Sequence, residues 1–376
     1  MKLAVLLSHA LHERNFVHSG LHGFLEQRGH RVMTFIPGHA RFARLRRSLR
    51  LAAMVAEEPR TQPYRHKATL RRGVNRVEAA VWRRLAGRGV DLVAWARRVE
   101  ARLPIPPYIC EAIRAARPDV FLWATMIHQD ALENDFVRAA QTQGVPVLGA
   151  PASWDTLTTK GPFLTRPDRL IVWGAASARQ AVEQHGFASE AVSAPGPPHF
   201  CPYEDGPIPP GEGVLVAGTS LHYWPDEERI IAGLRQALAP VEVAYRPHPR
   251  RRGAWDPDVW AVRRDLEPAA AIVAAFSTVV IEGALLGRPS LLVGFGVGPH
   301  GHALEHRHYD HMAHVASWPH VLVVESRNAL YDGLREWLAA PLIEEQQHEL
   351  RERALEVANC RPGLHERIAL AIEAAR

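Results

Sequence analysis

The sequence predicts an α/β fold made of two doubly wound, Rossmann-like domains that face a cleft. Short apolar runs alternate with segments of helical spacing along most of the chain, which is typical of parallel strands connected by helices. The segment 194–213 is dense in Pro and Gly, and the alternation starts again after it. The length of 376 residues suits two domains of ordinary size.

These observations predict the domain boundaries. We expect an N-terminal, acceptor-side domain over 1–196, with an Arg-rich helical insert at 41–102. A C-terminal, nucleotide-sugar-binding domain is expected over 210–355. The remaining helix, 356–376, is a candidate to return to the first domain.

The elements of the first half follow from periodicity. Apolar runs predict strands at 2–7, 31–37, 119–125, 146–151 and 168–174. Helices are expected over 16–28 with a stop at Gly29, over 41–102, at 108–116, at 131–143 and up to about His185. The polar segments 8–14 and 153–161 are expected to be loops.

The second half repeats the pattern. Strands are expected at 214–218, 241–249, 270–276, 289–295 and 320–326, and helices at 226–238, 277–287, 327–338 and 342–374. Ligands of such sheets bind beyond the carboxyl ends of the strands. The loops that follow these strands therefore hold the candidate chemistry.

The charge distribution is uneven. Residues 41–102 hold 16 Arg and one Lys against four Glu and one Asp, a net charge of +12, while the whole chain carries +5. Arg spaced among Leu, Val and Trp suits peripheral contact with an anionic membrane, and it equally suits a solvated helical hairpin. The stretch contains no recognised nucleic-acid module, so we expect no nucleic-acid partner.

Cysteine use and hydropathy indicate the compartment. Three widely spaced Cys form no CxxC pair, which is typical of a reducing cytoplasm. No run approaches the roughly 20 apolar residues of a membrane span, and the N-terminus shows no signal-peptide cleavage site. We expect a cytoplasmic protein. If the basic stretch binds lipid, the protein would be peripherally bound at the inner face of the membrane.

Three loops of the second half carry groups that bind phosphate. Arg246 and His248 stand at the end of a strand, beside Pro247 and Pro249, which stiffen the turn, and both can donate to phosphate oxygens. Ser277 or Thr278 caps a helix whose N-terminus favours anions, and Glu282 follows one turn later, within reach of a ribose. The third loop holds Gly218, Thr219 and Ser220, although a plain turn explains it equally well. No GxGxxG or P-loop pattern occurs.

Two loops of the first half carry candidate catalytic groups. Asp155 is a candidate general base on an acceptor hydroxyl, and Lys160 could neutralise developing phosphate charge. The neighbouring Trp154 is placed on the acceptor or sugar side. His12 is a second candidate base, although a single His in such a loop is more often a hydrogen-bonding residue.

The segment 299–314 is rich in His. It contains no Cys and no HExxH pattern, so we expect no metal there and no cofactor besides the donor. A polar loop with one His, His302, against the sugar is the preferred interpretation.

The ordered motifs SWDTLTTKG (153–161), YRPHP (245–249) and FSTVVIEGALLGRPSLL (276–292) resemble those of bacterial GT-B-fold enzymes of surface-polymer synthesis. This group includes CDP-glycerol glycerophosphotransferases and polysialyltransferases. The resemblance implies that Arg246, His248, Ser277 and Thr278 bind the donor phosphates and that Glu282 holds the ribose. Trp154 and Lys160 fit a further motif of the glycerophosphotransferases, but Asp155 stands where that family has a catalytic His.

The function expected is therefore a metal-independent glycosyltransferase that moves a sugar from a nucleotide-activated donor to an acceptor hydroxyl, in cell-surface glycan or glycolipid synthesis. The acceptor would be a glycan, a lipid-linked molecule or a small molecule. Two enzymatic alternatives remain, a CDP-polyol phosphotransferase and a non-hydrolysing UDP-sugar 2-epimerase. The non-enzymatic alternative is a carbohydrate- or lipid-binding protein whose site is catalytically inactive.

Overall fold

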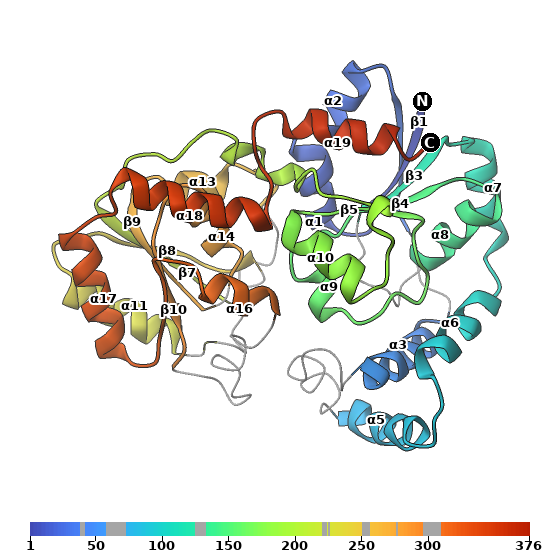
Figure 1. The fold of residues 1–376 in the computed structure, drawn as a ribbon, viewed down its shortest axis with the longest axis horizontal. Helices are drawn as coiled ribbons and strands as arrows, with labels where there is room; N and C mark the ends of the chain where they lie inside the picture. Colours follow the sequence, from blue (N-terminus) through green and yellow to red (C-terminus); the bar gives the residue numbers. More distant parts are fainter. Residues whose placement is uncertain are drawn as a thin grey trace. The chain divides into compact units, whose positions relative to one another are not determined.

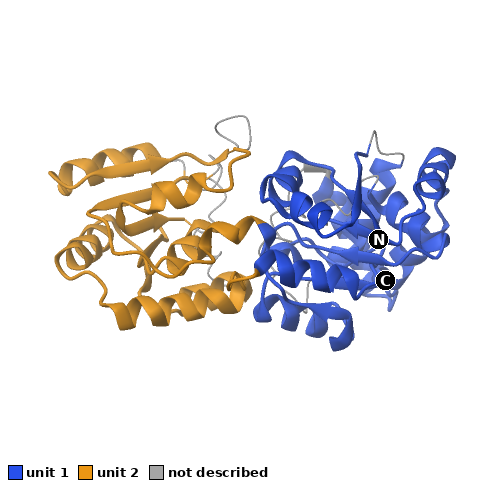
Figure 2. Ribbon diagram, turned by 90° about the horizontal axis from the view of Figure 1, so that it is seen from above, with its two compact units in different colours: residues 1–198, 364–376 blue, residues 199–363 orange. Residues whose placement is uncertain are grey.

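Two parallel β-sheets organise this chain, shown as a computed structural model in Figure 1. Residues 1–198 and 364–376 form unit 1, and residues 199–363 form unit 2 (Figure 2). The structure describes residues 1–37, 42–57, 73–124, 133–219, 224, 226–249, 256–275, 277–295 and 310–376.

The sheet of unit 1 has six parallel strands in the order β2-β1-β3-β4-β5-β6. Their bounds are β1 Lys2–Leu6, β2 Arg31–Phe35, β3 Val120–Trp123, β4 Val147–Gly149, β5 Arg169–Ile171 and β6 Val192–Ser193. The chain passes from β1 to β2 on one side and then to β3 on the other. The β1–β3 boundary is thus the topological switch point, where such sheets bind ligands.

Helices surround this sheet. Their bounds are α1 Ala10–Glu13, α2 Leu21–Gln27, α3 Ala43–Glu57, α5 Gly73–Ala86, α6 Leu92–Arg102, α7 Pro107–Ala116, α8 Glu133–Thr142, α9 Thr156–Thr159, α10 Ala175–Glu183 and α19 Leu364–Glu373. A π-helical turn at Arg14–His18 continues α1, and a 3-10 turn at Ser189–Ala191 precedes β6.

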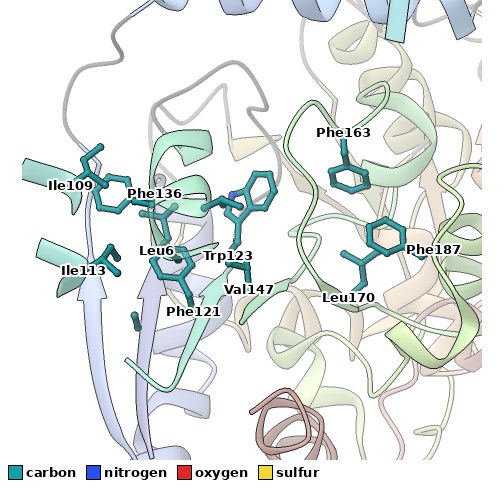
Figure 3. Packing of buried hydrophobic residues seen from close by; sticks show 14 of the residues in the cluster. Leu6, Ile109, Ile113, Phe121, Trp123, Phe136, Val147, Phe163, Leu170 and Phe187 are labelled. Carbon is teal, nitrogen blue, oxygen red and sulfur yellow. The ribbon is translucent and has the colours of Figure 1, made fainter. Parts of the chain in front are cut away.

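The core of unit 1 is built on the sheet face covered by α7 and α8 (Figure 3). Its strand residues include Leu6, Phe121 and Val147, and the helices add Ile113 and Phe136. Central strands of a parallel sheet are covered on both faces, which explains why β1 and β3 are unbroken apolar runs, whereas the edge strand β2 contains the exposed Arg31 and Thr34. Burying such side chains contributes roughly 1.5–3 kcal/mol each to folding.

Two segments expected to be loops contain helical turns. In the segment 8–14, the His9 ring accepts the Leu11 N–H at 3.1 Å, and α1 begins at once. In the segment 153–161, Thr158 and Thr159 donate their hydroxyls to the Asp155 carbonyl, and α9 forms. Both loops are therefore more ordered than the polar sequence suggested.

The described part of the Arg-rich insert consists of α3, α5 and α6, with a non-helical connection at 87–91, and one buried arginine anchors it. Arg46 of α3 donates to Glu100 of α6 at 3.0 Å and to Asp135 of α8 at 3.0 Å, and all three side chains are buried. Burial opposes the charge of Arg46, but the hydrogen bond with Asp135 and the charge of Glu100 outweigh it and raise its pKa. Burial also raises the pKa of Glu100. The insert is thus locked to α8.

The sheet of unit 2 has five parallel strands in the order β11-β10-β9-β7-β8. Their bounds are β7 Gly213–Ala217, β8 Val243–Arg246, β9 Ala269–Ala274, β10 Ser290–Val293 and β11 Val321–Val324. The helices are α11 Glu227–Ala237, α13 Ala261–Leu266, α14 Val279–Leu285, α16 Asp310–Ala316, α17 Arg327–Ala339 and α18 Glu344–Val357, and a 3-10 helix spans Pro198–Tyr203. The element α13 was not predicted.

The helices of unit 2 cover both faces of its sheet (Figure 1). Packing joins α11 with α17, and α14 with both α13 and α18. The core includes Ile230 and Leu234 of α11, Leu330 and Trp337 of α17, and Leu291 of β10. Together with unit 1, this confirms the predicted α/β fold of two doubly wound, Rossmann-like domains.

The helix expected over 342–374 is interrupted. After α18 ends, Pro362 and Gly363, whose φ is +78°, break the helix before α19. The second piece, α19, packs on α2 of unit 1. Arg28 donates to Glu366 at 2.7 Å and to Glu373 at 2.7 Å, and His30 contacts Glu373 at 2.8 Å. These contacts tie the end of the chain to unit 1.

Candidate functional site

The loops predicted to bind phosphate all start at the carboxyl ends of the unit 2 strands. Ala217, the last residue of β7, is paired with Arg246 of β8 on one side and with Ala274 of β9 on the other. The Gly218 N–H donates to the Arg246 carbonyl at 2.8 Å. Since the chain leaves β7 towards β8 and returns on the other side as β9, the carboxyl end of β7 lies at the switch point of unit 2.

Arg246 is held in place at this switch point. Its side chain is 12% exposed and forms an ion pair with Asp265 of α13. It also donates to the Ala261 carbonyl at 3.5 Å. Within the described part of the chain, both bonds come from Nη1, which leaves the Nη2 side of the guanidinium as the one to offer to an anion. His248 lies two residues further and is half-buried.

The loop after β7 is shaped by an internal carboxylate. Glu227 of α11 is buried, accepts the Thr219 N–H at 2.9 Å and accepts the Tyr245 hydroxyl. A Cβ on Gly218 would lie 2.7 Å from Glu227 Oε1 and 3.0 Å from the Tyr245 ring. The glycine is therefore required by packing within unit 2. Ser220 lies outside the described residues.

The third loop leads into α14. Ser277 Oγ accepts the Val279 N–H at 3.3 Å, so Ser277 caps the turn, while the Thr278 side chain makes no capping bond. Glu282 is 5% exposed, and its Oε1 accepts the Tyr203 hydroxyl at 3.2 Å. The carboxylate expected near a ribose is thus buried in the unit, with one oxygen bonded to a tyrosine.

A buried polar network occupies the switch point of unit 1. Ser8, which follows β1, donates to Glu133 of α8 and contacts Nδ1 of His12 at 3.4 Å. Glu133 also accepts the indole N–H of Trp123 at 2.9 Å. His12 and Glu133 are fully buried. His12 is thus part of a hydrogen-bonded cluster and is covered in this structure.

Sequence reasoning missed Glu133. An acidic residue at the start of a helix is usually solvated and favoured by the helix dipole. The sequence signal that could have found it is the polar run Glu133-Asn134-Asp135 before an apolar helix face. The structure shows that all three side chains are fully buried. Three buried polar side chains in sequence require partners elsewhere in the fold.

Asp155 lies after β4 and is more accessible than His12. Its side chain is 17% exposed, and it accepts hydroxyl hydrogen bonds from Ser153 at 2.6 Å and Thr159 at 2.9 Å. Lys160 Nζ lies 3.8 Å from Asp155 Oδ2. The predicted acid and cation are therefore neighbours. These contacts hold the carboxylate in one orientation.

The rest of this segment is buried. Trp154 is 7% exposed, so the ring expected to face an acceptor is mostly enclosed by the fold. Asn15, three residues after His12, donates to the Ala152 carbonyl at 3.2 Å and brings the segments of the two candidate bases together. His185 donates to the Leu157 carbonyl at 2.6 Å, and burial lowers the pKa of its imidazole.

The His-rich segment is only partly described. Its last residues belong to α16, where a loop was expected, and His302 lies outside the described residues. Among the residues that the structure covers, no three His, Cys, Asp or Glu side chains are grouped to hold a metal ion.

No helix within the described ranges is long and apolar enough to span a bilayer.

No family model and no curated protein matches the chain. Solved structures match it over its length. A co-structure of S. aureus MnaA with UDP has a TM-score of 0.53 and 12% identity, covering 98% of this chain and 94% of that one. The glycosyltransferase VinC in complex with dTDP has a TM-score of 0.52 and 16% identity, covering 100% and 99%.

A third structure is the UDP-GlcNAc 2-epimerase of Neisseria meningitidis bound to UDP-GlcNAc, with a TM-score of 0.52, 10% identity and complete coverage of both chains. Identities this low establish the fold alone. The chain therefore shares its two-domain α/β fold with a glycosyltransferase and with a UDP-sugar epimerase.

Proposed function

We propose that the chain is a glycosyltransferase whose unit 2 binds a nucleotide-activated sugar. One observation carries the proposal: Ala217 is paired with both Arg246 and Ala274, so the three loops with phosphate-binding residues leave the sheet at its switch point. Solved structures that share the fold are complexes with UDP and dTDP, which supports a nucleotide as the ligand.

The donor phosphates are the ligand of Arg246 and His248. The guanidinium is fixed by Asp265, so it offers preoriented donors to the phosphate that departs with the nucleotide. Ser277, Thr278 and the hydroxyl of Thr219 are the further phosphate contacts. Glu282 is the ribose contact in a conformation in which its carboxylate turns away from Tyr203. The positive charge of Arg246, together with the hydrogen-bond donors of His248 and the hydroxyls, takes the place of a metal ion in stabilising the leaving group.

The acceptor is activated from unit 1. Asp155 takes the proton of the acceptor hydroxyl, the oxygen bonds to the anomeric carbon, and the bond from that carbon to the phosphate oxygen breaks. Asp155 is preferred to His12 because its carboxylate is partly accessible, whereas His12 is fully buried. We place the reaction in cytoplasmic synthesis of surface glycans or glycolipids, with Lys160 balancing the charge of Asp155.

A UDP-sugar 2-epimerase is the second candidate, because an epimerase bound to UDP-GlcNAc shares the fold. The two functions differ in their need for an acceptor. An epimerase converts its nucleotide sugar into the 2-epimer without an acceptor, while a glycosyltransferase transfers the sugar to an acceptor hydroxyl and releases the nucleotide.

The first experiment is a thermal-shift screen with CMP, CDP, UDP, GDP and dTDP. A ligand of the native state raises the melting temperature by mass action. We expect one nucleotide to stabilise the protein and the Arg246→Ala variant to lose that stabilisation. The corresponding nucleotide sugars and CDP-glycerol are then incubated with and without acceptors. Absence of any nucleotide effect, or donor conversion without acceptor, would overturn the glycosyltransferase proposal.

A further inference from the structure

The Arg-rich insert has a hydrophobic core of its own. Residues of α3, α5 and α6 form a cluster separate from the core on the sheet, with members that include Leu51, Ala52, Val55, Ala79 and Leu92. On α5, the side chains turned into this cluster are Ala79, Trp82, Leu85 and Ala86. The Trp82 and Trp95 rings lie 5.1 Å apart within it. Packing of the insert therefore uses one side of α5.

The opposite side of α5 is exposed and basic. Arg76, Val77, Val81, Arg84 and Arg88 are exposed, and their spacing places the four on the helix on one face, with Arg88 just past its end. Val77 is 70% exposed and Val81 is 55% exposed. The exposed residues of α5 include no acid. Among the described residues, Arg76, Arg84 and Arg88 form no ion pair with a carboxylate. We call these five residues the α5 face.

Some exposed arginines of unit 2 are paired with acids, while others in the described chain, such as Arg114 and Arg179, are not. Arg229 pairs with Asp226, Arg335 with Asp332, and Arg361 with Glu352. The α5 face thus combines positive charge that no carboxylate within the described chain neutralises with two apolar side chains left in water. Such a surface favours an anionic partner with an apolar layer.

The face is presented by a rigid element. The helix α5 packs on α3, and α3 is locked to α6 and α8 by the buried ion pairs of Arg46. Figure 1 shows α5 as the outermost helix of this group, away from the six-stranded sheet. A partner bound to the α5 face is therefore held in a fixed relation to unit 1.

We propose that the α5 face docks on an anionic lipid bilayer. The guanidinium groups of Arg76, Arg84 and Arg88 contact lipid phosphates, and Val77 and Val81 enter the boundary between headgroups and acyl chains. A bilayer fits better than a nucleic acid, because the centre of the face is aliphatic and Trp82, the one aromatic side chain of α5, faces the core. The inference is independent of the donor site in unit 2.

The test is sedimentation of the full chain with vesicles of phosphatidylcholine alone and of phosphatidylcholine mixed with phosphatidylglycerol. Binding to the anionic vesicles is expected, with little to the neutral ones, and added salt should weaken it. Each arginine near such a surface contributes about fivefold in affinity, so Arg84→Gln with Arg88→Gln should bind about 25-fold more weakly. Val77→Ser with Val81→Ser should also weaken binding, at unchanged charge.

Matched controls remove the same groups elsewhere. Arg229→Gln with Arg335→Gln removes two exposed arginines from unit 2, and Val182→Ser removes an exposed valine from α10. Both controls should bind vesicles like the unaltered protein, and melting temperatures should show that every variant is folded. Equal loss in the control and the α5 variants would overturn the proposal. So would binding to single-stranded RNA through the same arginines without binding to vesicles.

Discussion

Arg246 and Asp265 form an ion pair at the switch point of unit 2, so the cation best placed to bind phosphate is already oriented by a carboxylate. A hydrogen bond to a charged group is worth about 1.5–3 kcal/mol. We therefore expect Arg246→Ala to weaken nucleotide binding by roughly tenfold to a hundredfold, measured by titration calorimetry. Arg264→Ala, which removes an exposed arginine of α13 next to Asp265, is the control and should bind normally.

The negative charge of Asp265 also partly neutralises the positive charge of Arg246 that would attract a phosphate. Asp265→Asn keeps an oxygen that can accept from Arg246 but removes the negative charge. Nucleotide binding should become tighter, and the gain should shrink as salt is added. Weaker binding in this variant would mean that the ion pair, and not the arginine alone, builds the phosphate site.

Asp155 should be needed for turnover and not for donor binding. General base catalysis contributes roughly 10²–10⁴-fold, so Asp155→Asn should lower kcat by about that factor while the nucleotide affinity stays unchanged. Ser153→Ala removes a hydrogen bond to Asp155 but keeps the carboxylate, and should cost far less. Normal turnover of Asp155→Asn together with an inactive His12→Gln would assign the base to His12.

Glu133 should matter for the stability of unit 1. Glu133→Ala removes the acceptor of the buried Trp123 indole N–H, and an unsatisfied buried donor costs about 1–3 kcal/mol. Denaturant unfolding should show this loss. In a double-mutant cycle, Trp123→Phe should recover part of it, because the phenyl ring has no donor to satisfy. Strictly additive effects would contradict the coupling.

Arg46 should be among the most sensitive positions of the insert. Arg46→Met leaves Glu100 and Asp135 without their buried cation, which costs about 3–5 kcal/mol. Replacing Glu100 and Asp135 by Leu in the same chain should restore most of the stability, since an apolar cluster of similar volume needs no charge compensation. The free energy of unfolding of both variants tests this, and failure of the triple variant to recover would point to lost packing.

His185 should make stability depend on pH. Burial lowers its pKa in the folded protein below the ordinary value of 6.5, so the unfolded chain takes up a proton at a higher pH than the folded one. Stability should therefore fall as the pH drops through 6.5. In His185→Gln, which can still donate to the Leu157 carbonyl, the melting temperature should vary less between pH 7 and the acid side of 6.5. An unchanged pH profile would show that other groups dominate.

The strands could be predicted from sequence because their cause is local. A parallel strand covered on both faces is an unbroken apolar run, and Ala217, Arg246 and Ala274 each end such a run or stand next to its end. Knowledge of strand ends was enough to place the three loops that are predicted to bind phosphate.

The missing parts depend on contacts that are distant in sequence. Arg46 contributed to the predicted basic surface, yet it pairs with residues 54 and 89 positions away and is buried. Glu133 binds Ser8 across 125 positions. Gly218 was expected to admit a phosphate, but the neighbours that exclude a side chain are Glu227 and Tyr245. Charge and composition do not reveal which polar residues find partners.

The return of α19 to unit 1 limits when unit 1 can be completed during synthesis. Unit 2 is one continuous segment, 199–363, whereas unit 1 is split around it. The ribosome synthesises α19 only after all of unit 2. Unit 2 can therefore fold while the apolar side of α2 is not yet covered by α19. Leu364, Ile368 and Ile372, which are buried in α19, can complete unit 1 only after that point. Chaperone dependence during synthesis should therefore concentrate on unit 1, the half that was started first.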